Sequence, residues 1–293
     1  MRLQDAFELV LLAAIWGSSF LFMRTATPEF GAISLVAVRT SIAALCLLPF
    51  LMMSKQVKTV TSYWRQLLFL GVINTALPFC LFSYSTVQIG AGFAAILNAT
   101  APMFGALIAF LWLREKLTLW AVGGLVLGFV GVLVTTNARS ADSFYLAIMP
   151  ILAALGATCS YGIAVCYTRK WLAGVNALAI ATGSQIFAAT ALAPLAFLTW
   201  PAVMPSTSAW LQVLVMAVVC SAFAYILYFR LIANVGPTKA LSVGYLVTVF
   251  GVMWGMLFLG ETINSQIVIG ALLIMFGVSL TTGVIKQRQK AEP

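Results

Sequence analysis

The chain has 293 residues and a formal net charge of +9, with 62% hydrophobic residues and only 8% charged ones. An ordinary soluble domain carries roughly 25% charged residues, so this composition excludes one and points to the membrane. The chain contains no histidine, which excludes Ser-His and Cys-His nucleophile pairs and histidine-based metal sites, and we expect neither enzyme activity nor a cofactor.

Apolar runs near 20 residues recur along the whole length, and about 20 residues cross the hydrocarbon core as a helix. The runs are continuous rather than alternating, which favours helices over a closed barrel. The connections between them are short and leave no room for a soluble domain. We predict an all-α integral membrane fold with ten transmembrane helices, at residues 6–26, 31–53, 66–86, 91–113, 118–136, 146–168, 175–199, 209–232, 239–259 and 265–285.

Arg39 lies inside the second of these spans. An ionisable residue within a span is a candidate functional residue by default. Arg39 is expected either to hold a carboxylate of the substrate or to form a structural ion pair with Glu29, which lies near the same membrane edge. The sequence leaves both possibilities open.

The third and fourth spans share a polar irregularity. Asn74 precedes Pro78 by four residues, and Asn98 precedes Pro102 by four residues. Proline removes the hydrogen bond to the carbonyl four positions earlier, so each freed carbonyl belongs to an asparagine. The membrane tolerates such a site where protein or a wet cavity surrounds it. Both asparagines are expected to line a central cavity or to hydrogen-bond a neighbouring helix.

Polar aromatic side chains also occur within the spans, at Trp16, Tyr84, Tyr161, Tyr225 and Tyr245. Their hydroxyl or N–H groups need a partner when they are buried. We expect them either to bind substrate in a central cavity or to pack between helices. The cavity is predicted to be lined by spans 1, 3, 4, 6, 8 and 9.

Two glutamates and a set of glycines have structural interpretations. Glu115 and Glu261 each follow the last apolar turn of a span, where local ion pairing or helix-end capping is the natural role. Gly124 and Gly128 have the four-residue spacing that lets helices approach closely. Gly131, Gly270 and Gly277 extend this pattern, so we expect the fifth and tenth spans to pack tightly.

The chain reads as two copies of one unit. Residues 90–136 align with residues 236–282 at an offset of 146, pairing Glu115 with Glu261. If each copy has five spans, the second copy is inverted relative to the first, as in carriers that work by alternating access. We therefore expect repeats at 1–140 (helices 1–5) and 141–293 (helices 6–10), joined as one integrated membrane domain.

Basic residues indicate the orientation. With the N-terminus in the cytoplasm, thirteen of the sixteen Lys and Arg residues fall on the cytoplasmic side. The exceptions are Arg24, Arg39 and Arg139. The positive-inside rule therefore favours a multi-pass protein of the cell inner membrane with both termini cytoplasmic. Because the basic residues are scattered over short loops, nucleic-acid binding is not expected.

Several motifs resemble those of a known family. Spans 4 and 5 contain P-x-F-G-A, L-R-E-K-L and G-G-x-x-L-G-F-x-G-V, while spans 9 and 10 contain G-P-T-K-A-L, L-F-L-G-E-T-I and G-A-L-L-I-x-x-G-V. Together with A-A-I-W-G-S-S-F in span 1, these motifs resemble the EamA family of the drug/metabolite transporter (DMT) superfamily. The resemblance implies ten helices in an inverted repeat and transport of small metabolites, often amino acid export in the YddG-like branch. Thr248 stands where Pro102 stands in span 4, so a weaker kink is expected in span 9.

The expected function is export of small metabolites, amino acids above all, by alternating access through a central cavity. The alternatives are a nucleotide-sugar or drug-like cargo and, from another class, a membrane-embedded enzyme or assembly scaffold. The expected partners are a small-molecule substrate and the lipid bilayer, with the protein a monomer or weak homodimer. Because no acidic residue is expected in the middle of the membrane, we predict facilitated diffusion or exchange that depends weakly on protons.

Overall fold

The computed structural model describes residues 2–137, 141–236, 240 and 243–283, and within these ranges the protein is helical and contains no strand. Two of its elements are short π-helices, which are labelled η. The elements in chain order are α1 (Leu3–Phe30), α2 (Ala32–Met53), α3 (Val57–Ser62), α4 (Trp64–Gly71), η1 (Val72–Ala76), α5 (Leu77–Ile89), α6 (Ala91–Asn98), α7 (Ala101–Leu113), α8 (Leu119–Asn137), α9 (Ala141–Trp171), α10 (Ala177–Leu198), α11 (Thr207–Ala217), η2 (Val218–Phe223), α12 (Ala224–Val235), α14 (Val243–Leu259) and α15 (Ser265–Thr281).

Within the described ranges, eight helical stretches are long and apolar enough to cross a membrane, and they correspond to the first eight predicted spans. The last two predicted spans correspond to α14 and α15, which are apolar helices of 17 residues each. The predicted repeat boundary at residue 140, Arg139, Lys239 and the basic residues of the C-terminal tail lie outside the described residues.

The prolines interrupt spans 3 and 4 as predicted. The π-helix η1 precedes α5, which has Pro78 in its first turn. In the next span α6 ends at Asn98 and α7 begins at Ala101, just before Pro102. In contrast, α14 runs unbroken through Thr248, where the sequence has no proline. The expectation of a weaker kink in this second region is confirmed.

A second π-helix, η2, was not predicted, because it contains no proline. Within it the Ser221 hydroxyl donates to the Met216 carbonyl five residues earlier, at 3.0 Å. A side chain that bonds back to the helix offers the backbone an alternative to the ordinary ladder. Single-turn π-helices are frequent at functional sites, so the residues around η2 are candidates for a functional site.

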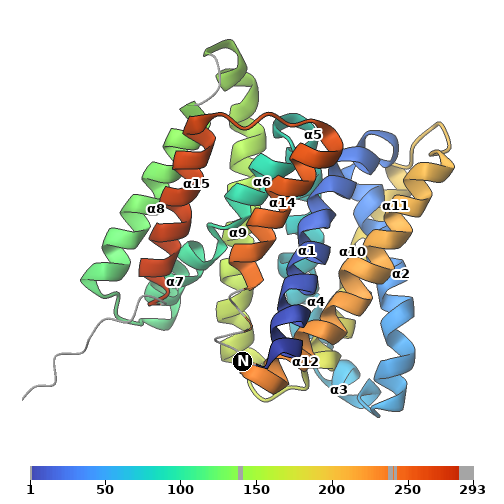
Figure 1. Cartoon of the computed structure of the whole chain (residues 1–293). Helices are drawn as coiled ribbons and strands as arrows, with labels where there is room; N and C mark the ends of the chain where they lie inside the picture. Colours follow the sequence, from blue (N-terminus) through green and yellow to red (C-terminus); the bar gives the residue numbers. More distant parts are fainter. Residues whose placement is uncertain (1, 138–140, 237–239, 241–242, 284–293) are drawn as a thin grey trace, which may run out of the picture.

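Helices α8 and α15 lie side by side at one edge of the bundle (Figure 1), although they are far apart in the sequence. A Cβ atom added to Gly124 would lie 2.5 Å from the Gly277 carbonyl oxygen, and one added to Gly131 would lie 2.8 Å from the Gly270 carbonyl oxygen. The two backbones touch at these glycines, as predicted for the fifth and tenth spans.

Two further close approaches join distant parts of the chain. Gly17 of α1 packs against Phe250 and Gly251 of α14, where an added Cβ would lie 2.9 Å from the Gly251 nitrogen. Gly162 of α9 packs against Phe104 and Gly105 of α7, where an added Cβ would lie 2.8 Å from the Gly105 nitrogen. In both cases a glycine of one helix packs against a Phe-Gly pair of another: α1 on α14, and α9 on α7.

Candidate functional site

Arg39 is buried inside the bundle, with 3% of its surface exposed. Its Nε donates to the Ser221 hydroxyl at 3.1 Å and its Nη2 to the Ser19 hydroxyl at 3.4 Å, while Nη1 lies 4.0 Å from the Met216 sulfur. The guanidinium carbon lies 4.2 Å from the centre of the Phe79 ring. All of these partners are neutral. We call Arg39, Ser19, Ser221 and Phe79 the arginine pole.

The predicted alternative, an ion pair between Arg39 and Glu29, is wrong. Glu29 instead accepts hydrogen bonds from the Ser206 backbone nitrogen at 2.6 Å and from the Ser206 hydroxyl at 3.0 Å, near the start of α11. Residues 28–31 form the turn at the end of α1, and an exposed carboxylate there is better satisfied by a nearby N–H than by a buried cation.

The other carboxylates whose side chains the structure describes are also engaged away from Arg39. Asp142 and Glu292 lie outside the described side chains. The contacts are Asp5 with Arg2 and Asn234, Glu8 with Arg230 at 3.2 Å, Glu115 with Arg169 at 2.6 Å, and Glu261 with the backbone nitrogens of Ala91 and Gly92. Arg39 is therefore a buried cation with no acidic partner among the described side chains.

A second polar group lies beside the first. Gln185 of α10 has no exposed surface, and among the described atoms neither its amide nitrogen nor its amide oxygen has a hydrogen-bond partner within 3.5 Å, although the amide interacts with the Tyr225 hydroxyl. Its amide lies against Tyr225, which also lies near Arg39. Thr75 of η1, the π-helix that packs on α10, is likewise fully buried with an unpartnered hydroxyl. We call Gln185, Thr75 and Tyr225 the glutamine pole.

The two poles are related by sequence position. Three pairs of residues are each separated by 146, the offset of the internal repeat, and each pair has one member in each pole: Arg39 and Gln185, Ser221 and Thr75, Phe79 and Tyr225. The corresponding contacts are a guanidinium above the Phe79 ring in one pole and an amide against Tyr225 in the other. Positions 146 residues apart thus carry different chemistry in the two poles.

Of the eight residues expected to bind substrate, three lie close enough together to interact electrostatically: Arg39, Tyr161 and Tyr225. Tyr161 also stacks on Phe82, with ring centres 6.2 Å apart. Trp16 is adjacent to this group, because its ring centre lies 5.2 Å from that of Tyr228, one turn from Tyr225.

The remaining four lie elsewhere or have no contact with the poles. Tyr84 is 44% exposed on α5, and the Tyr245 hydroxyl lies 3.3 Å from the Thr282 hydroxyl at the end of α15. Asn74 lies in η1 and Asn98 ends α6, both partly buried. No hydrogen bond joins either amide to a neighbouring helix among the described residues.

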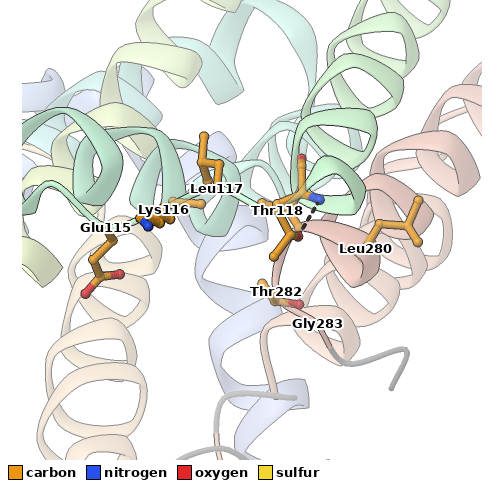
Figure 2. Close-up of a pocket in the computed structure, with 10 residues that line it drawn as sticks. Glu115, Lys116, Leu117, Thr118, Leu280, Thr282 and Gly283 are labelled. Carbon is orange, nitrogen blue, oxygen red and sulfur yellow. Dashed lines mark hydrogen bonds between the residues drawn. The ribbon is translucent and has the colours of Figure 1, made fainter. Parts of the chain in front are cut away.

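The hollow in Figure 2, of about 450 Å³, is a different feature. It is lined by the turn between α7 and α8 and by the end of α15, including Glu115, Lys116 and Thr282. Thr118 accepts from the Ala121 nitrogen at 3.2 Å and so caps α8. Neither Arg39 nor Gln185 lines it, and we do not regard this surface hollow as the binding site.

Glu115 and Glu261 have structural roles, as expected, but with partners remote in sequence. The Glu261 carboxylate accepts from the backbone nitrogens of Ala91 and Gly92 at 2.7 and 2.8 Å, at the first turn of α6. A carboxylate there satisfies free N–H groups and complements the helix dipole. Glu115 instead pairs with Arg169 at the surface, not with its sequence neighbours.

The prediction missed Gln185, Thr75, Ser19 and Ser221, and it assigned no lining role to spans 2 and 7, which supply Arg39 and Gln185. The repeat offset itself would have found Gln185, since it occupies the position of Arg39 in the second copy. Among the described residues no group of three His, Cys, Asp or Glu side chains could hold a metal ion. Arg39 offers a positive charge, and Arg39 and Gln185 both offer hydrogen-bonding groups to a ligand.

Comparison with known proteins gives a consistent picture. The model of the EamA-like transporter family matches the chain twice, at residues 6–137 and 148–283. One similar protein is the uncharacterized transporter YvbV of Bacillus subtilis, 22% identical over 99% of this chain and 95% of that protein. Another is the uncharacterized inner membrane transporter YedA of Escherichia coli K12, 25% identical over 94% of this chain and 89% of that protein.

Protein PecM of Dickeya dadantii is 23% identical over 95% of this chain and 93% of that protein. A solved crystal structure matches 98% of this chain and the whole of that chain, with a TM-score of 0.66 at 17% identity. At this identity the structural match supports the fold alone.

Proposed function

Because the chain belongs to the EamA-like transporter family, it is a membrane transporter, and we propose that it moves small metabolites that carry a carboxylate, a class that includes the amino acids, by alternating access. The proposed site is the buried region between the arginine and glutamine poles. It is proposed to lie in a multi-pass protein of the cell inner membrane, and YedA is an inner membrane transporter by name.

The observation that carries the proposal is the buried Arg39 without an acidic partner. An unpaired charge inside a protein costs several kcal/mol, and within a membrane an ionisable residue marks a substrate or ion pathway by default. A guanidinium has five N–H donors in a fork that matches a carboxylate in a bidentate manner. Serine hydroxyls and a sulfur use one donor on each nitrogen, which leaves two donors for cargo.

Alternating access is supported by the positions of the contacts. The region between the poles is closed in this structure, since Arg39 is 3% exposed and Gln185 fully buried. Matching residues of the two copies pack across each other, as Gly17 does on Phe250 and Gly162 on Phe104. This arrangement is what two inverted five-helix repeats around a central site require, and we propose that the ten helices form such repeats.

The remaining predicted residues receive proposed roles around this site. Tyr161 and Tyr225 are proposed to contact the cargo. Trp16 packs on Tyr228 and is proposed to support this wall of the site. Asn74 and Asn98 are proposed to supply polar groups on the path when the break in each helix opens. Tyr84 and Tyr245 are proposed to meet cargo only near the two ends of that path.

With both termini proposed to be cytoplasmic, Glu261 and the start of α6 lie at the outer face, and Glu115 lies at the inner face. The Glu261 contact with two α6 nitrogens closes the outer end. Glu115, at the equivalent position, bonds to Arg169 instead. A reporter fused after Pro293 should be cytoplasmic; a periplasmic C-terminus would contradict this orientation and the inverted repeat with it.

The proposed function is tested by counterflow in proteoliposomes that contain the purified protein and no ion gradient. A panel of radiolabelled amino acids, other carboxylates, a nucleotide-sugar and an organic cation should show exchange for carboxylates. Arg39→Gln should abolish this exchange, whereas Arg65→Gln, at an exposed arginine beside Trp64, should leave it unchanged. Exchange confined to the organic cation, or unchanged in Arg39→Gln, would contradict the proposal.

A further inference from the structure

We propose that the carrier prefers monoanionic carboxylates, such as 2-hydroxy or 2-oxo acids, to the zwitterionic amino acids of the same side chain. This inference rests on the proposed function and narrows it. It follows from the difference between the two poles, since one carries a cation and the other carries only neutral hydrogen-bonding groups.

The arginine pole determines where the carboxylate binds. Arg39 is held in place by Ser221 and Ser19, and Ser221 is itself anchored to the Met216 carbonyl. The unassigned N–H groups of the two terminal nitrogens point to a two-oxygen acceptor. A carboxylate bound there gives the guanidinium a partner of opposite charge and neutralises it.

The glutamine pole determines which group can accompany the carboxylate. Gln185 offers one acceptor oxygen and an NH₂ donor, both buried beside the Tyr225 hydroxyl, and Thr75 offers a buried hydroxyl with no partner among the described atoms. A 2-hydroxyl group can donate and accept, and a 2-oxo group can accept from the amide nitrogen. An ammonium group has three donors and no acceptor, so it can donate to the amide oxygen of Gln185 but cannot accept from the amide nitrogen.

Charge balance favours the monoanion as well. The five described carboxylates have other partners: Asp5, Glu8, Glu29, Glu115 and Glu261 are all engaged away from the poles. A monoanion makes the closed site neutral, whereas a zwitterion leaves it with one positive charge and places an ammonium near a guanidinium. Like charges close together in a poorly solvated site repel each other strongly.

The test compares ligands that share a side chain. Competition against counterflow, together with thermal stabilisation of the purified protein, is measured for L-phenylalanine, L-phenyllactate and phenylpyruvate, and for the smaller set alanine, lactate and pyruvate. We expect the monoanions of at least one set to bind at least tenfold more tightly than the matching amino acid, a difference of about 1.4 kcal/mol.

A variant at the glutamine pole should reverse this order. Gln185→Glu places a carboxylate where the ammonium of an amino acid would lie, so it should favour the amino acid over the hydroxy acid. The matched control is Gln88→Glu, at an exposed position near the end of α5, which should keep the wild-type order.

The outcomes separate the two proposals. An amino acid that binds as tightly as its hydroxy acid in the wild type overturns the preference for monoanions. It does not contradict the proposed function, which is transport of carboxylates. If no carboxylate of either kind competes or stabilises, the proposed function fails and the preference fails with it. Should Gln185→Glu not fold, the wild-type ligand series alone decides.

Discussion

The arginine and glutamine poles occupy equivalent positions of the two copies yet differ in how their polar groups are satisfied. Ser221 of η2 accepts from Arg39 at 3.1 Å, whereas Thr75 of η1, 146 positions earlier, has no hydrogen-bond partner among the described residues. Both lie on π-helices, although a proline follows only the first. The two π-helices thus share a backbone form but differ in the hydrogen bonding of their hydroxyls, and the proposed site between the poles would bind the two ends of one asymmetric molecule.

The largest expected effect comes from removing the charge of the arginine pole. Arg39→Gln should lower carboxylate counterflow by about 100-fold, because a hydrogen-bonded charged pair contributes up to about 3 kcal/mol. The melting temperature should not fall, since the variant removes an unpaired buried cation. Transport is measured in proteoliposomes and folding by thermal unfolding in detergent; transport within twofold of wild type would remove Arg39 from the site.

Moving the charge from one pole to the other tests whether the poles are equivalent. Gln185→Arg alone should destabilise the protein, because two cations then lie in one buried region. When Gln185→Arg is combined with Arg39→Gln, the double variant should show counterflow at least tenfold faster than Arg39→Gln alone. Non-additivity of this kind is expected only for residues that share a site. A double variant no better than Arg39→Gln would show that the poles are not interchangeable.

The hydroxyl groups of the two π-helices should differ in their effect on stability. Ser221→Ala removes a group that accepts from Arg39 and donates to Met216, so it should cost about 1–2 kcal/mol. Thr75→Val removes an unpartnered hydroxyl at nearly constant volume and should be neutral or stabilising. Thermal unfolding of both variants in the same detergent gives the comparison. Equal destabilisation would mean that Thr75 is satisfied in the folded protein.

The smallest expected effect concerns the two equivalent glutamates. Glu261→Gln weakens two charge-assisted bonds to the first turn of α6 and should cost about 1 kcal/mol. Glu115→Gln breaks a surface pair with Arg169, both residues being about half exposed, and should cost nearly nothing. A larger loss of stability in Glu115→Gln would place the tighter contact at the other end of the bundle.

Much of the fold could be predicted from the sequence. Continuous apolar runs predicted the helices, the glycine spacing predicted the close packing of α8 on α15, and the prolines predicted the breaks beside Asn74 and Asn98. These features are local, because a run length, a missing N–H or an absent side chain acts within one or two turns.

The site was harder to predict, because it depends on contacts between residues far apart in the chain. Arg39 was identified as an ionisable residue in a span. The local sequence gives no signal for its hydroxyl partners, Ser19 and Ser221, or for Gln185. Tyr84, Tyr161 and Tyr245 are all tyrosines within predicted spans. Only the packing of the helices places Tyr161 near Arg39 and the other two away from it. The π-helix η2 likewise could not be predicted, because it contains no proline.

The central claim is that Arg39 binds the carboxylate of the cargo, and a ligand-protein charge cycle tests it most directly. The affinity of one transported carboxylate and of its uncharged carboxamide is measured for the wild type and for Arg39→Gln. The wild type should prefer the carboxylate by about 100-fold, and Arg39→Gln should bind both forms within about threefold of each other. A preference for the carboxylate that persists undiminished in Arg39→Gln would show that another group holds it.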